Sequence, residues 1–240
     1  MFNKGFIALS LATVGLAISS AAANAITFEL KSDWNRDTEF IGLINSGEFK
    51  EEFVAESRIG DSSGNATYEV GLLDFDNNNL PVAQSNYGWT NGEAVDFTLE
   101  LNGGLLNYTV GNKLLSSQAF SGDLIEDLLI RARSSDNSTM SLVNLALNGV
   151  SLPDLIANPG EVKYLEVGDL ATNFTLTGTS IMSWTGDRPR NSHLAYQIKA
   201  GVLTTNDDIA SVPEPATISL LSLGVVGTLL TRTRRRKQDA

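Results

Sequence analysis

A short run of acidic and amide side chains offers the clearest chance of metal chemistry in this sequence. Asp74, Asp76 and Asn78 alternate within the segment DFDNNN, and carboxylate and amide oxygens are the hard ligands that Ca²⁺ prefers. An EF-hand loop would also need glycine at its sixth position and glutamate at its twelfth, where this chain has Asn79 and Ser85. We therefore predict a calcium loop of another type, with a metal-free polar turn as the alternative.

Two aromatic residues could bind sugar. Tyr87 and Trp89 lie in the segment YGWTNG, whose composition predicts an exposed loop that carries aromatic side chains. The alternative is that Trp89 packs in the core, as large aromatic side chains usually do.

Catalytic chemistry has little support. His193 is the one histidine, cysteine is absent, and no G-x-S-x-G motif occurs, so a Ser/His/Asp hydrolase would depend on His193 alone. A glycosidase needs two carboxyl groups facing each other across a sugar cleft, and the sequence spacing does not identify such a pair. We predict that the protein is not an enzyme.

Period-two alternation predicts the strands that would position these residues. Residues 94–101 alternate Val95, Phe97, Leu99 and Leu101 with polar residues, which is typical of a strand with one buried face. Breaks at 102–104 and at Gly111-Asn112 turn residues 94–115 into a three-stranded meander.

The rest of the chain predicts further strands joined by turns. We expect strands at 26–30, 66–72, 128–133, 139–147 (with Val143, Leu145 and Leu147 inward), 164–167, 174–179 and 194–200, and a loop at 153–160. Residues 47–58 fit either a short amphipathic helix or an exposed strand. Many short strands without strand–helix alternation predict an all-β fold, an antiparallel β-sandwich of jelly-roll or lectin-like type.

Both ends of the chain predict export. Lys4, an apolar stretch and the A-x-A site formed by Ala23 and Ala25 predict a signal peptide at residues 1–25. Residues 26–211 would form the folded domain, and residues 212–240 a tail. The uncharged apolar run 216–231 is at the short limit for a transmembrane helix. The cations that follow it would hold the C-terminus in the cytoplasm: Arg232, Arg234, Arg235, Arg236 and Lys237.

The net charge of the predicted domain limits the classes of partner that it could bind. The whole chain carries a net charge of −11; without Lys4, the five tail cations, Glu214 and Asp239, 11 basic and 26 acidic residues leave −15. Such a domain repels phosphate backbones, so nucleic acid is excluded as a partner. Without cysteine no disulfide stabilises the fold, and we expect no cofactor other than calcium.

The tail resembles the PEP-CTERM sorting signal of Gram-negative bacteria. The matching residues are Val212, Pro213, Glu214 and Pro215, followed by the apolar run and the basic end. The resemblance implies recognition and cleavage by an exosortase, after passage through the secretion machinery and anchoring in the inner membrane. A plain single-span anchor is the alternative. Segments 107–113, 119–122, 129–133 and 174–184, with Gly186, Arg188 and Pro189, are similar to the choice-of-anchor surface domains of cyanobacterial type, in particular the one labelled W.

These observations predict an exported cell-surface or extracellular-matrix protein. We expect a structural or adhesive role in association with extracellular polysaccharide. The alternative is a lectin-like module that binds carbohydrate or calcium, and a secreted hydrolase is the least favoured hypothesis.

Overall fold

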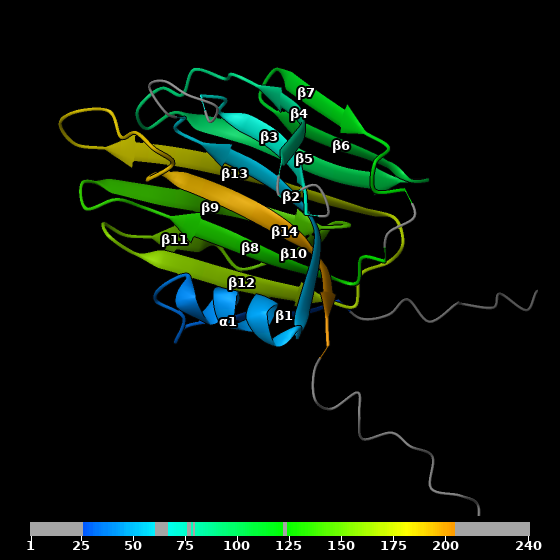
Figure 1. The fold of residues 1–240 in the computed structure, drawn as a ribbon. Helices are drawn as coiled ribbons and strands as arrows, with labels where there is room; N and C mark the ends of the chain where they lie inside the picture. The colour runs from blue at the N-terminus through cyan, green and yellow to red at the C-terminus, as the bar shows by residue number, and fades with distance from the viewer. Residues whose placement is uncertain (1–25, 61–66, 76–77, 79, 122–123, 205–240) are drawn as a thin grey trace, which may run out of the picture.

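Alternating apolar residues pair into two antiparallel sheets that lie face to face (Figure 1). The computed structural model describes residues 26–60, 67–75, 78, 80–121 and 124–204. Sheet A has the strand order β1 (Thr27–Leu30), β12 (Val162–Gly168), β8 (Asp127–Arg133), β14 (Ala195–Leu203), β2 (Phe49–Arg58), β3 (Val70–Asp74) and β4 (Leu80–Ser85). Sheet B has the order β10 (Val150–Ser151), β9 (Ser138–Leu147), β13 (Phe174–Trp184), β5 (Ala94–Asn102), β6 (Leu105–Val110) and β7 (Lys113–Ser117), with β11 (Leu155–Ala157) beside β9.

This arrangement confirms the all-β class and the two-layer antiparallel sandwich. The finer designation as jelly-roll or lectin-like stays a prediction. The predicted signal helix and transmembrane helix lie outside the described residues.

The predicted meander is confirmed. β5 pairs with β6 and β6 with β7, both antiparallel. Gly111 adopts φ +53° in the turn between β6 and β7, a left-handed conformation that glycine reaches without steric cost. Val95, Phe97, Leu99 and Leu101 are buried as their alternation predicts.

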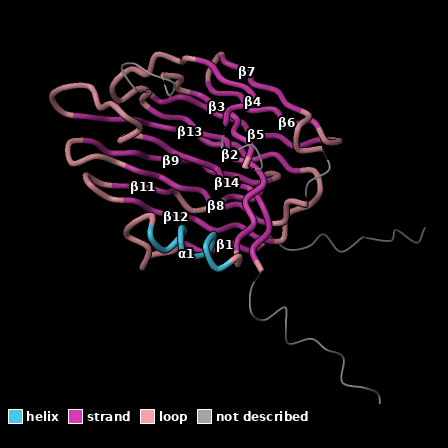
Figure 2. The backbone as a smooth tube through the Cα atoms, in the orientation of Figure 1, coloured by secondary structure: helices cyan, strands magenta, loops and turns pink. Residues whose placement is uncertain are grey.

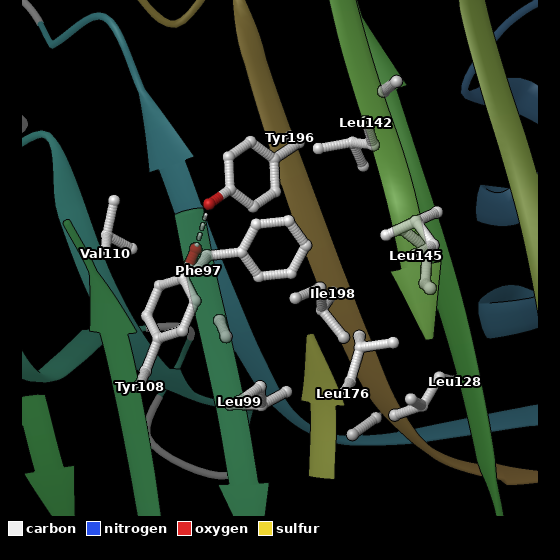
Figure 3. Packing of buried hydrophobic residues seen from close by; sticks show 14 of the residues in the cluster. Phe97, Leu99, Tyr108, Val110, Leu128, Leu142, Leu145, Leu176, Tyr196 and Ile198 are labelled. Atoms are coloured by element: carbon white, nitrogen blue, oxygen red, sulfur yellow. Dashed lines mark hydrogen bonds between the residues drawn. The ribbon is translucent and has the colours of Figure 1, made fainter. Parts of the chain in front are cut away.

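The core lies between the two sheets and contains one polar chain. Figure 3 shows Phe97, Ile198 and Leu176 packed against one another from opposite sheets. The Tyr108 hydroxyl donates to the Tyr196 hydroxyl at 2.9 Å and lies 2.9 Å from Ser57 Oγ. Burial raises the pKa of Tyr108 and raises that of Tyr196 to about 12, so this chain stays neutral.

A helix covers part of the outer face of sheet A, the face turned away from sheet B. The helix α1 (Thr38–Ser46) is the one helix of the described residues (Figure 2). Its Phe40 packs against Phe49 and Tyr164, forming a second apolar cluster with Leu129. The helix α1 was not predicted from the sequence, although Gly47, at φ +76°, provides an ordinary helix stop.

Residues 49–58 form the strand β2 rather than a helix, and the strand is buried rather than exposed. A bulge opposite Ala200 and Gly201 shifts the phase of β2. Phe49 therefore packs under α1, whereas Phe53 points into the core. A Cβ on Gly201 would lie 2.0 Å from the Lys50 carbonyl oxygen, so only glycine fits beside the bulge.

Two smaller predictions are also wrong. Asn144 has φ +54° and lies where the β9–β13 register shifts. As a result Leu142 and Leu145 point inward, and Val143 is only half-buried. The predicted loop at 153–160 contains β11, whose Leu155 and Ala157 are buried against the core.

Candidate functional site

Polar side chains form a row across the outer face of sheet A. The register places Tyr164, Arg131, Gln197 and Glu56 opposite one another on β12, β8, β14 and β2. Their neighbours along each strand point into the core, because side chains alternate between the two faces. Opposite residues on one face lie close enough to interact directly.

Asp37, which precedes α1, joins the helix to this row. Arg131 donates two hydrogen bonds of 2.6 Å to its carboxylate, and the Tyr164 hydroxyl donates a third of 2.8 Å. Burial alone would raise the pKa of Asp37, but the hydrogen bonds and charge of Arg131, with Tyr164, outweigh burial and lower it. The carboxylate is therefore held ionised in a bidentate pair.

The row continues from Arg131 to the far side of β2. Arg131 Nη1 donates to Gln197 Oε1 at 3.4 Å, and Gln197 Nε2 donates to Glu56 Oε2 at 2.8 Å. The Tyr68 hydroxyl donates to Glu56 Oε1 at 2.9 Å, and Arg58 Nε lies 3.4 Å from the same oxygen. Both oxygens of the buried Glu56 are thus engaged.

Two adjoining hollows open along this row, where β8 ends and α1 begins. Their volumes are about 380 and 280 Å³, and both are lined by Asp37 and Arg133. We call the two hollows together the outer-face cleft. Its other polar lining includes Arg36, Glu56, Arg58, Arg131, Ser192 and His193.

Arg133 differs from the other strand residues of the cleft. It is half-buried, and among the described residues its guanidinium forms no hydrogen bond or ion pair. Across the sheet it faces Ala195 on β14, and Ala195 in turn faces Arg58 on β2. The small side chain of Ala195 leaves open space between the two arginines.

The loop before β14 forms one rim of the cleft. Asn191 and Ser192 have φ of +56° and +57°, a conformation that costs of order 1 kcal/mol for a residue other than glycine. Ser192 Oγ accepts a 3.0 Å hydrogen bond from Arg58. His193 is exposed beside it, and no other described residue hydrogen-bonds to its ring, so the orienting partner of a catalytic base is missing there.

The aromatic pair predicted to bind sugar lies elsewhere, near β3. Trp89 is only 4% exposed and belongs to the core, so the prediction of an exposed tryptophan is wrong. The rings of Tyr87 and Trp89 are 4.7 Å apart between centroids. Tyr87 is half-buried and also packs on the turn at Gly111. The indole Nε1 of Trp89 is buried without a partner among the described residues.

A second open hollow of about 490 Å³ lies beside this pair. The buried Glu69 forms its floor and accepts hydrogen bonds from the backbone N–H groups of Tyr87 and Gly88, at 3.0 and 2.5 Å. Arg188 donates to the other oxygen of Glu69 at 2.6 Å. Tyr87 and Trp89 both line the hollow, but Trp89 is almost fully buried, so Tyr87 offers the larger surface to a ligand.

The calcium candidate is only partly covered by the described residues. Asp74 ends β3 and is half-buried, and Asn78 is exposed with φ +57°. Asp76 lies outside the described residues. Within them no group of three or more acidic, histidine or cysteine side chains could hold a metal ion, and calcium binding stays a prediction.

Sequence reasoning missed the outer-face cleft. Arg131 and Arg133 occupy alternate positions of a strand that it did predict, and Gln197 and Lys199 do the same on β14. The alternation of charged side chains with core residues on central strands could have indicated the cleft. The pairing of those strands with β2 could not be predicted from the sequence.

A comparison with known protein families identifies the tail. The family model described as the PEP-CTERM protein-sorting motif matches residues 211–236, which include Val212, Pro213, Glu214 and Pro215. No curated protein matches the chain. The motif indicates an exported precursor, anchored in a membrane and processed to the cell surface by an exosortase.

The tail and the predicted signal peptide lie outside the described residues. These include Ala23 and Ala25 as well as the basic residues from Arg232 to Lys237. In the part of the chain that the structure describes, no helix is long and apolar enough to cross a membrane. The resemblance of the domain to a choice-of-anchor type stays a prediction.

Proposed function

We propose that this exosortase-sorted protein binds extracellular polysaccharide through its β-sandwich, in a structural or adhesive role and without catalysis. Export would use the secretion machinery and a stage in the inner membrane. The folded domain would then act at the cell surface or in the extracellular matrix.

The outer-face cleft is the observation that carries this proposal. Several of its polar groups, among them the bidentate pair of Asp37 and Arg131, are fixed by one another before any ligand arrives. Preorganised polar groups reduce the entropy cost of binding. Because the cleft is open and most of its lining residues are polar, it suits a hydroxyl-rich polymer better than an apolar small molecule.

The absence of catalysis is part of the proposal. Hydrolysis would need a positioned base and nucleophile, or two carboxyl groups facing a cleft. In the outer-face cleft, Asp37 and Glu56 are already held by Arg131, Tyr68 and Gln197. Carboxylates engaged in this way serve as scaffold rather than as acid or base.

Affinity electrophoresis tests the binding. The purified domain is run in native gels that contain polygalacturonate, alginate or neutral dextran, with a gel lacking polymer as reference. We expect retardation by at least one polymer, and none for the same domain after heat denaturation. Unchanged mobility in all three polymers would refute the proposed function.

Mass spectrometry with cell fractionation tests the sorting. We expect a mature protein that lacks the basic C-terminal end and is found outside the inner membrane. An intact C-terminus at Ala240, recovered in the inner membrane, would contradict exosortase processing.

A further inference from the structure

We propose that the outer-face cleft selects acidic polysaccharide, and that Arg133 binds the carboxylate of a uronic acid unit. This inference rests on the proposed function and names the chemical class of the ligand. The local charge, the guanidinium of Arg133 and the shape of the cleft support it.

The charge of the cleft is opposite to that of the domain. The domain between the predicted signal peptide and tail carries 11 basic and 26 acidic residues. Five of the 11 line the cleft, against the acidic residues Asp37, Glu56 and Asp136. A local excess of cations in an otherwise acidic protein draws an anionic ligand to this one place. The five are Arg36, Arg58, Arg131, Arg133 and Lys199.

Arg133 is the half-buried cation of the cleft that has binding capacity to spare, whereas Arg36 is exposed. Arg131 is held by Asp37 at 2.6 Å, and Lys199 by Glu51 at 3.1 Å. Among the described residues, Arg133 has no such partner, although it is half-buried. A guanidinium in a partly dry cleft gains most from a carboxylate, which it binds with two parallel hydrogen bonds.

The cleft has room for the ligand beside this guanidinium. Ala195 leaves the space between Arg133 and Arg58 open, and the rim residues Ser192 and His193 add polar groups. Asp136, which lines only the first hollow, is exposed and has no ion pair among the described residues. Its charge would repel an anion from that part of the cleft. The carboxylate therefore fits best at the shared boundary of the two hollows.

The size of the cleft indicates a sugar unit rather than an inorganic ion. Its two hollows measure about 380 and 280 Å³, each near the lower bound of about 300 Å³ for sites that hold organic ligands. Both are open, so a polymer can continue beyond the bound unit. A small inorganic anion would occupy the guanidinium and leave most of the cleft empty.

The test compares charge variants by calorimetry. A galacturonate trimer is titrated into wild type, Arg133→Gln and Lys113→Gln, with a neutral galactose trimer as reference ligand and EDTA present throughout. Lys113→Gln is the matched control, because it removes the same charge from a half-buried residue of sheet B. We expect Arg133→Gln to weaken binding at least about tenfold, since a charge-assisted pair is lost, and Lys113→Gln to leave it unchanged.

Three results of the titrations would overturn the inference. The galactose trimer could bind as tightly as the galacturonate trimer, or folded Arg133→Gln could bind like wild type. Alternatively, sodium sulfate could bind at Arg133 and the trimer not at all, which would identify a simple anion site. Retardation by neutral dextran alone would keep the proposed function and refute only this inference, whereas no retardation by any polymer would refute both.

Discussion

The two ends of sheet A carry opposite charge, and one strand joins them. β8 begins at Asp127 and ends at Arg133, a distance of about 20 Å at about 3.3 Å per residue. At its end lies the outer-face cleft, with its arginines. At its start Asp127 faces Glu126, Glu166 and Asp169. The same sheet therefore presents a basic end and an acidic end.

The difference between the ends is one of pairing rather than of composition. Asp37 at the basic end is fixed by Arg131, which lowers the pKa of its carboxyl despite burial. Asp127 has no ion pair among the described residues. Its pKa is raised to about 6, mainly by burial and further by the charges of Glu166, Glu126 and Asp169, although the Leu203 N–H that donates to it acts in the opposite direction. The half-buried carboxylate at the basic end is thus paired with an arginine, whereas the half-buried carboxyl at the acidic end has no cationic partner among the described residues.

Removing Arg131 from the basic end is expected to change the free energy of unfolding more than any other substitution considered for either end. Arg131→Gln leaves Asp37 and Gln197 without their donor in a buried row, so we expect the free energy of unfolding to fall by about 3 kcal/mol. Urea denaturation measures it. Arg133→Gln is the control and should change stability by less than about 0.5 kcal/mol. Equal losses in the two variants would show that the row is not a structural unit.

At the acidic end, removing a charge should raise the stability of the fold rather than lower it. Asp127→Asn keeps an oxygen to accept the Leu203 N–H and removes a disfavoured charge. We expect it to stabilise the protein at neutral pH by about 1 kcal/mol, after allowance for solvent screening. Thermal unfolding measured at pH 7.5 tests this, and a lower melting temperature would contradict it.

The pH dependence sharpens the same contrast. A carboxyl with a raised folded pKa binds protons more tightly when folded, so wild type should gain stability as the pH falls from about 7 towards 4. Asp127→Asn should flatten the profile in that window. Asp37, with its lowered pKa, stabilises the fold above its unfolded pKa of 3.8, and that contribution is lost only at lower pH. A profile of Asp127→Asn identical to wild type would assign the dependence to other groups.

Calcium should give the smallest effect, at the acidic end. Asp74 pairs with Phe53 near the start of β2, at the same end of sheet A as Asp127. If the predicted loop binds calcium, the stability gain is about 0.4 kcal/mol when calcium equals its Kd. We expect a small rise in melting temperature that Asp74→Ala abolishes. An unchanged melting temperature in wild type at millimolar calcium would contradict the prediction of a calcium-binding loop.

The sequence predicted the elements whose signals are local. The strands of residues 94–115 have strict alternation and turn residues between them, and β8 follows the alternation of Leu128, Ile130 and Ala132. β2 escaped because its bulge places Phe49 and Phe53 on opposite faces, and because α1 buries the outer face as well. A strand that is buried on both sides loses the two-residue period on which the prediction depends.

The cleft could not be predicted because its contacts are distant in sequence. Arg131 lies 94 positions from Asp37 and 66 from Gln197, and Gln197 lies 141 from Glu56. Only the strand order β12-β8-β14-β2 brings these side chains into one row. Trp89 illustrates the converse, since its loop composition suggested exposure although the ring fills the core.

The position of β14 has a mechanical consequence. It is the last described strand, it ends at Leu203 on the acidic end, and it pairs along its length with both β8 and β2. A pull from the tail, resisted by polymer held in the cleft at the opposite end, would run parallel to this strand. Antiparallel hydrogen bonds lie perpendicular to the strands, so two ladders would bear the load together in shear, the direction in which a sheet resists force best.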